Sequence, residues 1–175
     1  MMNSSTPEAC LTFRTVFVTK DGYQHVAAQF YPSHSKNLNL LLHLVGALIQ
    51  MWGVVQLLLI NNLQMVVYAY MALVALSCPL AIGVTHSVCF WMLMAVPTNS
   101  VVPANVDPIV GCVVAFFCAI LMPLGHRLSD EPPFMKHYLR ERPYLLFYHT
   151  IWQLPLLMDA YSPLSTVKHA FKEKK

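Results

Sequence analysis

Between Leu38 and Gly125 the chain carries a single formally charged side chain, Asp107. A water-soluble domain of this length would expose many charges, because a typical globular chain is about 25% charged. The whole chain of 175 residues is 11% charged and 57% hydrophobic. The sequence therefore predicts an integral membrane protein surrounded by membrane lipid. Its net charge of +3 arises from the two ends and one loop, which argues against a nucleic-acid partner.

Several apolar stretches are candidates for crossing a bilayer, which takes about 20 predominantly apolar residues in a helix. They are Leu40–Ile60, Gln64–Val84, His86–Val96, Ile109–Leu124 and Tyr144–Tyr161. The third stretch is short for a span, although the apolar residues before it could be shared with it through a tight turn at Cys78-Pro79 or Gly83. The last suits a span, a re-entrant segment or an interfacial helix. We predict an all-α, polytopic membrane helical bundle of about four to five spans. The loop Pro97–Pro108 contains three prolines and is expected not to be helical.

Basic residues set the predicted orientation, because they favour the cytosolic side of a membrane. They gather before the first stretch, after the fourth and at the end of the chain, whereas the connections at Asn61-Asn62 and Pro97–Pro108 have none. Four crossings would then put both termini in the cytosol. The predicted units are a hydrophilic N-terminal arm (1–35), a transmembrane helical catalytic domain (36–162) and a basic C-terminal tail (163–175).

Two histidines and two asparagines, namely His34, Asn37, Asn39 and His43, lie where the arm meets the first apolar stretch. Such groups are costly to bury in a lipid-facing helix, so they need an explanation, and metal binding is the leading one. Asn39 and His43 are four residues apart and would share a helix face. His34 and His43 are nine apart, about 180° around a continuous helix. Both can reach one metal only if His34 lies in a non-helical segment.

A second polar cluster follows the fourth apolar stretch, at Gly125-His126 and Asp130-Glu131. His126 and Asp130 are four residues apart and would point the same way if the helix continues to Ser129. If the third stretch crosses the membrane, the predicted topology places four histidines at one cytosolic depth: His34, His43, His86 and His126.

These residue types suit a particular chemistry. Two or more neutral imidazoles with a carboxylate and open coordination positions fit a non-haem Fe(II) centre that activates oxygen. Zinc accepts the same ligands, so the ligand type does not choose between the metals. Asparagine is a poor ligand for either metal and is better suited to orient a histidine or a substrate carboxylate. His149 and Gln153, one helical turn apart, are candidates for lining a substrate cavity.

The spacing Tyr-x2-His-x2-Asn-x-Asn-x3-His-x2-Gly from Tyr31 to Gly46 resembles the family of membrane 2-hydroxy fatty acid dioxygenases. These enzymes act in the fungal conversion of phytosphingosine into odd-numbered fatty acids. The segments Gly125-His126, Asp130-Glu131 and Pro133-Phe134 resemble the second motif of that family. The order and separation of the two motifs fit, and the resemblance covers about residues 13–160.

The resemblance implies an Fe(II)- and O2-dependent α-oxidation of a 2-hydroxy fatty acid to a one-carbon-shorter product, at the cytosolic face of the endoplasmic reticulum. It implies that iron is held by His34, His43 and His126, with His86 or Asp130 completing the site. The other roles that it implies are catalytic ones for Asn39, Asp130 and Glu131, and substrate-binding ones for Asn37 and Arg127, with Lys36 also attracting the carboxylate.

Two other interpretations stay open. In a redox-neutral membrane cyclase or isomerase of a biosynthetic pathway, the same histidines and carboxylates would move protons, and activity would need neither iron nor O2. In a non-enzymatic membrane protein the histidines would merely lie at the interface, and His43→Ala would leave every function intact. A homodimer is compatible with the sequence, although no helix shows a clear GxxxG face.

Overall fold

The computed structural model of this protein describes residues 23–24, 26–27, 30–103, 106–132 and 143–162. Every element in this part of the chain is helical, as the sequence predicts. In chain order the elements are η1 (Tyr31–Ser33), α3 (Asn37–Ile60), α4 (Gln64–Ser77), α5 (Leu80–Ala95), α6 (Thr98–Val101), α7 (Pro108–Phe117), η2 (Cys118–Ile120), α8 (Leu121–Ser129) and α10 (Pro143–Tyr161).

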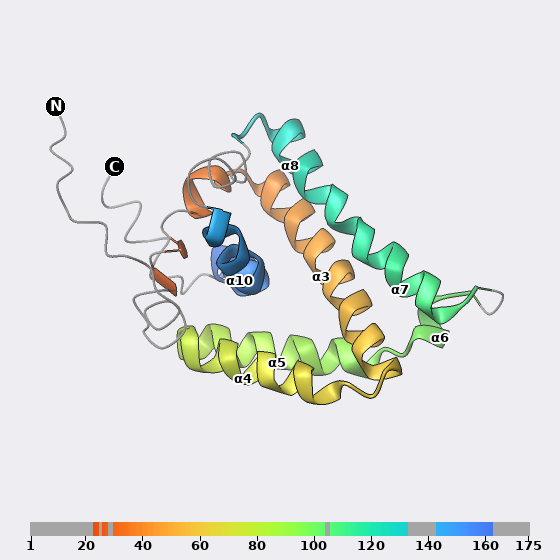
Figure 1. Ribbon diagram of the computed structural model, residues 1–175. Helices are drawn as coiled ribbons and strands as arrows, with labels where there is room; N and C mark the ends of the chain where they lie inside the picture. Colours follow the sequence, from red (N-terminus) through yellow and green to blue (C-terminus); the bar gives the residue numbers. More distant parts are fainter. Residues whose placement is uncertain (1–22, 25, 28–29, 104–105, 133–142, 163–175) are drawn as a thin grey trace, which may run out of the picture.

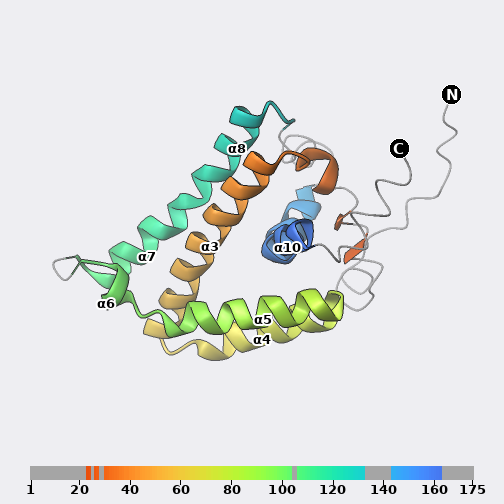
Figure 2. The same cartoon turned by 180° about the vertical axis from the view of Figure 1, so that it is seen from behind.

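Helix α3 lies side by side with the rod formed by α7, η2 and α8 (Figures 1 and 2). Two glycines of α3, seven residues apart, allow this close approach. A Cβ atom on Gly53 would lie 2.6 Å from the carbonyl oxygen of Cys112, and one on Gly46 would lie 3.2 Å from that of Cys118. The packing brings the start of α3 beside the end of α8.

Helices α4 and α5 form a hairpin with the tight turn expected at Cys78-Pro79, so a continuous helix over Gln64–Val84 does not form. Helix α4 ends at Ser77, and Cys78 is extended, with φ −100° and ψ 163°. Pro79 explains the break, because proline disfavours a helical residue before it and lacks the N–H that would continue the helix. Residues 80–84 belong to α5, so the third apolar segment is longer than expected.

The connection after α5 also differs from the prediction, which excluded helix between Pro97 and Pro108. Residues Thr98–Val101 form a single helical turn, α6, directly after Pro97. A second proline opens the next helix, since Pro108 is the first residue of α7 and Asp107 caps it by accepting from the N–H of Ile109 at 2.7 Å. Prolines here precede or begin helices, where the missing N–H has no cost.

Helix α10 lies between two arms, one formed by α3 with α7–α8 and the other by α4–α5 (Figure 1). The arms meet where Trp52 Nε1 donates to the Val96 carbonyl and Gln56 Nε2 donates to the Leu93 carbonyl, both at 2.9 Å. The apolar side chains of α10 that are almost fully buried are Trp152, Leu154, Leu156, Leu157 and Ala160. Because α10 has apolar residues on all of its faces, it is expected to lie in the interior of the helical domain.

The described end of the predicted N-terminal arm belongs to the same core. Its buried side chains are Tyr23, Val26, Ala27, Phe30 and Tyr31, which cluster with those of α3, α5 and α10. The predicted boundary near residue 35 therefore does not separate this segment from the helical domain. The C-terminal tail, 163–175, lies outside the described residues.

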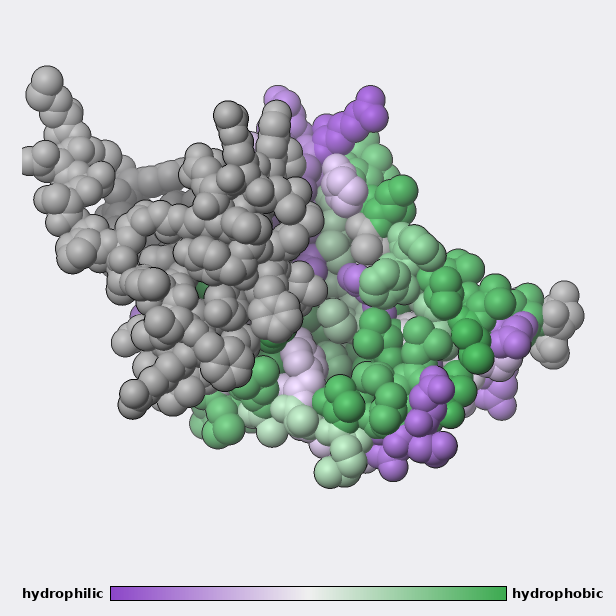
Figure 3. Space-filling model, in the orientation of Figure 1, coloured by the Kyte–Doolittle hydropathy of each residue, from purple (hydrophilic) through white to green (hydrophobic). Residues whose placement is uncertain are grey.

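Two helical segments, Asn37–Ile60 and Pro108–Ser129, are long and apolar enough to cross a membrane by length and composition. Helices α4 and α5 are apolar but shorter. In Figure 3 apolar residues cover the face over α7, and hydrophilic residues gather near the end of α8 and the turn between α3 and α4. Such a surface is consistent with membrane association. The number of crossings and the orientation stay predictions.

Candidate metal centre

Three buried imidazoles come together from separate parts of the chain. His34 directly follows η1, His43 lies in the second turn of α3, and His126 lies in the last turn of α8. The ring centroids of His34 and His43 are 4.6 Å apart, and each lies 4.8 Å from that of His126. One nitrogen of each ring lies within 4.8 Å of the other two, so the group, which we call the three-histidine cluster, can hold a metal ion.

A transition metal would draw the three rings closer together. Imidazole nitrogens bind such an ion at about 2.0–2.1 Å, so three nitrogens on one ion are about 2.9–3.6 Å apart. Nitrogens at the upper end of the 4.8 Å range would therefore have to approach by at least about 1 Å.

His34 reaches the cluster because it lies outside α3, as the nine-residue separation from His43 requires. Its backbone has φ −137° and ψ 50°, and its N–H donates to the Tyr31 carbonyl at 3.1 Å. The ring Nδ1 lies 2.9 Å from the Phe30 carbonyl, which only accepts, so Nδ1 carries the proton and Nε2 the lone pair. The His34 ring also stacks on Phe30, with centroids 3.8 Å apart, and one of its faces is thereby covered.

Asn39 connects the other two histidines to the rest of the site. His43 Nδ1 donates to the Asn39 carbonyl at 3.0 Å, again leaving the lone pair on Nε2. The Asn39 Nδ2 atom lies 3.0 Å from the Ser33 carbonyl, 2.7 Å from Glu131 Oε2 and 3.3 Å from His126 Nδ1. An amide has two hydrogens, and the two shorter contacts use them. The 3.3 Å contact with His126 Nδ1 is therefore the weakest of the three.

Glu131 holds the start of α3 in place. Its Oε1 accepts from the backbone N–H of Ser35 at 2.8 Å, from the Ser35 hydroxyl at 2.6 Å and from the N–H of Lys36 at 3.0 Å. Burial alone would raise the pKa of this carboxyl, but these hydrogen bonds and that from Asn39 outweigh burial and lower the pKa of Glu131. The Glu131 carboxylate thus accepts the N–H of Lys36, the N-cap residue of α3, and lies at the positive end of the helix dipole.

Asp130 ends α8 and does not join the imidazoles. It is exposed, and its left-handed backbone, φ 51° and ψ 44°, is one that aspartate tolerates. The N–H groups of Asp130 and Glu131 both donate to the His126 carbonyl. Helix α8 continues to Ser129, as the expected helix face shared by Asp130 and His126 required, but Asp130 itself is left-handed and leaves that face, so the expectation is wrong. The same turn directs Glu131 back toward Ser35.

His86 is also separate from the three-histidine cluster. Its ring lies between α4 and α5, 5.3 Å from the Tyr70 ring and 4.5 Å from the Phe90 ring by centroids. It is fully buried, and neither ring nitrogen has a hydrogen-bond partner among the described residues. The predicted convergence of four histidines therefore reduces to three.

We expect His86→Leu to raise the free energy of unfolding by about 1–2 kcal/mol, because it removes buried polar atoms that lack partners. Metal affinity should not change. Denaturant unfolding in detergent micelles and a metal titration on the same sample check both parts. Weakened metal binding in a folded variant would instead make His86 part of the site.

The remaining predicted site residues are Gln153, Asn37, Arg127 and His149. Gln153 is buried, and its Nε2 lies 2.6 Å from Met122 Sδ. Met122 lies one helical turn before His126 in α8. Asn37, the first residue of α3, and Arg127, in the last turn of α8, are both exposed. His149 belongs to the part of α10 where only the backbone is described.

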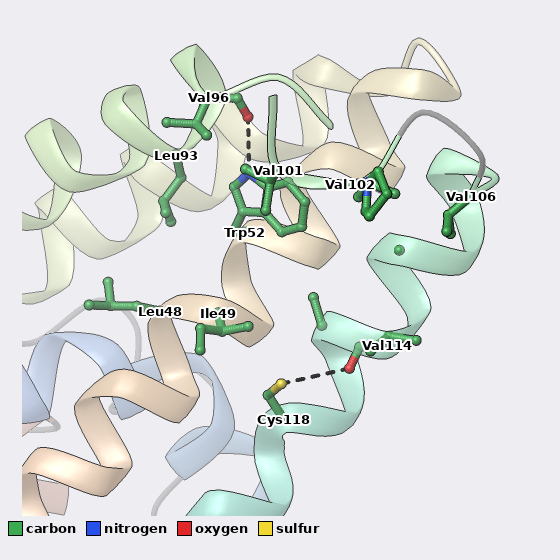
Figure 4. Close-up of a pocket in the computed structure, with 13 residues that line it drawn as sticks. Leu48, Ile49, Trp52, Leu93, Val96, Val101, Val102, Val106, Val114 and Cys118 are labelled. Carbon is green, nitrogen blue, oxygen red and sulfur yellow. Dashed lines mark hydrogen bonds between the residues drawn. The ribbon is translucent and has the colours of Figure 1, made fainter. Parts of the chain in front are cut away.

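An apolar cavity of about 570 Å³ lies elsewhere, between α3, α5, α6 and α7 (Figure 4). Its α3 residues Leu48, Ile49 and Trp52 are about 140°, 240° and 180° around the helix from His43, so the cavity opens on another face. The Trp52 N–H already donates to the Val96 carbonyl, and the Cys118 thiol contacts the Val114 carbonyl at 3.8 Å. The cavity thus offers hydrocarbon contacts and is distinct from the three-histidine cluster.

Two contributions to the site were not predicted: the stacking of Phe30 on His34 and the capping of α3 by Glu131. A signal for the second exists in the sequence. The first turn of α3 has no acidic residue, and Lys36 at its N-cap makes no side-chain cap hydrogen bond. The free N–H groups at the start of α3 therefore require an acceptor from elsewhere.

Comparison with protein-family models, with curated proteins and with solved structures finds no match for this chain.

Proposed function

We propose that this protein is a membrane oxygenase that binds Fe(II) at His34, His43 and His126 and oxidises a lipophilic hydroxy acid with O2. The observation that carries the proposal is the convergence of three buried imidazoles from separate segments. Three protein nitrogens leave coordination positions for a substrate and for oxygen, as non-haem iron centres require. The bound metal would supply oxygen activation at this site.

The choice of metal and substrate rests on the sequence resemblance. Zinc would fit the same three nitrogens. The motifs at Tyr31–Gly46 and Gly125–Glu131 resemble those of 2-hydroxy fatty acid dioxygenases, which favours iron over zinc and a 2-hydroxy fatty acid as substrate. The reaction would cleave the C1–C2 bond, with C1 leaving as CO2 and O2 as the four-electron oxidant, so that the 2-hydroxy acid and O2 give a one-carbon-shorter acid, CO2 and water.

In this proposal Asn39 and Glu131 hold the ligands and do not transfer protons to the substrate. Both oxygens of Glu131 already accept hydrogen bonds, and both hydrogens of the Asn39 amide are used. Groups that orient ligating histidines in this way tune metal affinity. The same engagement disfavours a redox-neutral cyclase in which the Glu131 carboxyl would have to exchange protons freely.

Two residues near the cluster suit a hydroxy acid. Arg127 is exposed at the end of α8, where a guanidinium can pair with a carboxylate. Lys36 is less suited, because its Nζ already donates to the Ser129 carbonyl. The Gln153 amide contacts the thioether of Met122, a weak acceptor, so a substrate oxygen would be a better partner.

The membrane placement is part of the proposal. Helix α3 and the rod α7–α8 would cross with α4 and α5, and α10 would be the fifth helix between them, giving the predicted four to five spans. The basic residues would then put the cluster at the cytosolic face, for which the endoplasmic reticulum is the expected membrane.

The test is an anaerobic preparation loaded with Fe(II) and given a 2-hydroxy fatty acid and O2, with products identified by mass spectrometry. We expect a one-carbon-shorter acid from the wild type and none from His43→Ala or from iron-free protein. His86→Leu is the matched control, because it removes a buried histidine outside the cluster and should keep activity. Iron binding without turnover would reject the substrate, and a folded protein with neither would reject the oxygenase and favour the proton-transfer alternative.

A further inference from the structure

Helix α10 contributes to the interior a carboxyl group that belongs to no metal-binding motif. Asp159 is 3% exposed and lies among apolar side chains of α10. A carboxyl group in such surroundings is costly unless it is hydrogen-bonded. Its Oδ2 accepts from the hydroxyls of Tyr23 at 3.1 Å and of Tyr31 at 2.9 Å. Asp159 therefore ties the segment before α3 to α10.

One of these tyrosines leads directly to the three-histidine cluster. Tyr31 begins η1, and its carbonyl accepts the N–H of His34 at 3.1 Å. His34 is the one member of the cluster outside a long helix, so the position of its ring depends on how η1 is held. The Ser33 carbonyl ties the end of η1 to Asn39 at 3.0 Å. The Tyr31 hydroxyl ties its beginning to Asp159.

The other tyrosine provides an internal comparison. Tyr23 donates to the same carboxylate oxygen, and its ring packs edge-on against Trp152 with centroids 6.1 Å apart. It lies eight residues before Tyr31 and is not part of η1. Loss of either hydroxyl removes one phenol–carboxyl hydrogen bond, but only loss of the Tyr31 hydroxyl releases the turn that carries His34.

We propose that Asp159 is a positioning residue for the metal centre, which fixes His34 against His43 and His126 through the Tyr31 hydroxyl and η1. This inference rests on the proposed metal centre. Helix α10 then takes part in the site without contributing a ligand. Groups that orient metal ligands typically change metal affinity 10- to 100-fold when they are removed.

The first test is a titration of the metal-free protein with Co(II), followed by its visible absorption. We expect Tyr31→Phe to raise the Kd about 10-fold. Tyr23→Phe should stay close to the wild type, although it loses an equivalent hydrogen bond. Asp159→Ala should match Tyr31→Phe, and Asp159→Asn, which keeps an oxygen acceptor, should restore most of the affinity. Equal affinities for Tyr31→Phe and Tyr23→Phe would overturn the inference.

The second test needs no metal. Hydrogen–deuterium exchange of the peptide that covers residues 30–36 reports on η1, because the His34 amide is hydrogen-bonded to Tyr31. Exchange there should be faster in Tyr31→Phe than in Tyr23→Phe, and equal exchange in both would overturn the positioning role. If the wild type binds no Co(II), the proposed metal centre fails, and the exchange result alone decides whether Asp159 holds His34.

Discussion

Replacement of Glu131 by alanine is expected to lower the free energy of unfolding by about 1–3 kcal/mol and to weaken metal binding at least about 10-fold. The alanine leaves two backbone N–H groups, the Ser35 hydroxyl and one Asn39 hydrogen without their acceptor. Ser35 and Lys36 are exposed and can donate to water, whereas Asn39 is buried, and a buried donor left unpaired costs about 1–3 kcal/mol. Denaturant unfolding of the metal-free protein and a Co(II) titration measure the two effects. A loss below about 1 kcal/mol would mean that water replaces the carboxylate.

The Glu131 hydrogen bonds also predict a direction for the pH dependence. The pKa of this carboxyl is lower in the folded protein than its usual value, so the unfolded chain binds more protons at acidic pH. The stabilisation is complete above the usual value, about 4.3, and is lost as the pH falls toward the lowered one. Glu131→Gln cannot ionise, so its stability should change less over this interval. Parallel pH profiles of the two proteins would contradict the assignment.

Replacement of Gly125 by alanine should destabilise the protein by about 1–3 kcal/mol and disturb the cluster directly. The added Cβ would lie 2.6 Å from Asn39 Oδ1 and 3.2 Å from His43 Nδ1. Asn39 cannot move aside easily, because its amide is hydrogen-bonded to Ser33 and Glu131. We therefore expect weaker Co(II) binding together with a lower unfolding midpoint.

Gly46→Ala is the matched control for this prediction. Its Cβ would meet the Cys118 carbonyl and Leu121 Cβ at 3.2 Å, in the same helix interface but one turn away from the histidines. It should cost stability without changing the metal affinity of the remaining folded protein. If both alanine variants bind Co(II) like the wild type, the contact between Gly125 and Asn39 does not control the site.

The position of His34 outside α3 was predictable because it depends on local geometry. The nine residues between His34 and His43 require a break between them, and His34 indeed lies outside α3. The same local rules predict the helices and the tight turn at Cys78-Pro79, where Pro79 outweighs the continuous apolar pattern. The grouping with His126 is not local. It was expected from the predicted topology and the family resemblance, which also offered His86 and Asp130, and the structure places those two residues elsewhere.

The all-helical class and the break that places His34 outside α3 were determined by the sequence alone, since charge depletion, proline positions and histidine spacing act within a segment. The surroundings of those residues were decided by the tertiary structure. Asp130 turns away where α8 ends, His86 packs against Tyr70, and Asp159 meets Tyr31 across most of the chain. The physical reason is that a helix apolar on every side has no periodic pattern to mark its packed face. Which polar side chains meet is then settled by how the helices end and cross.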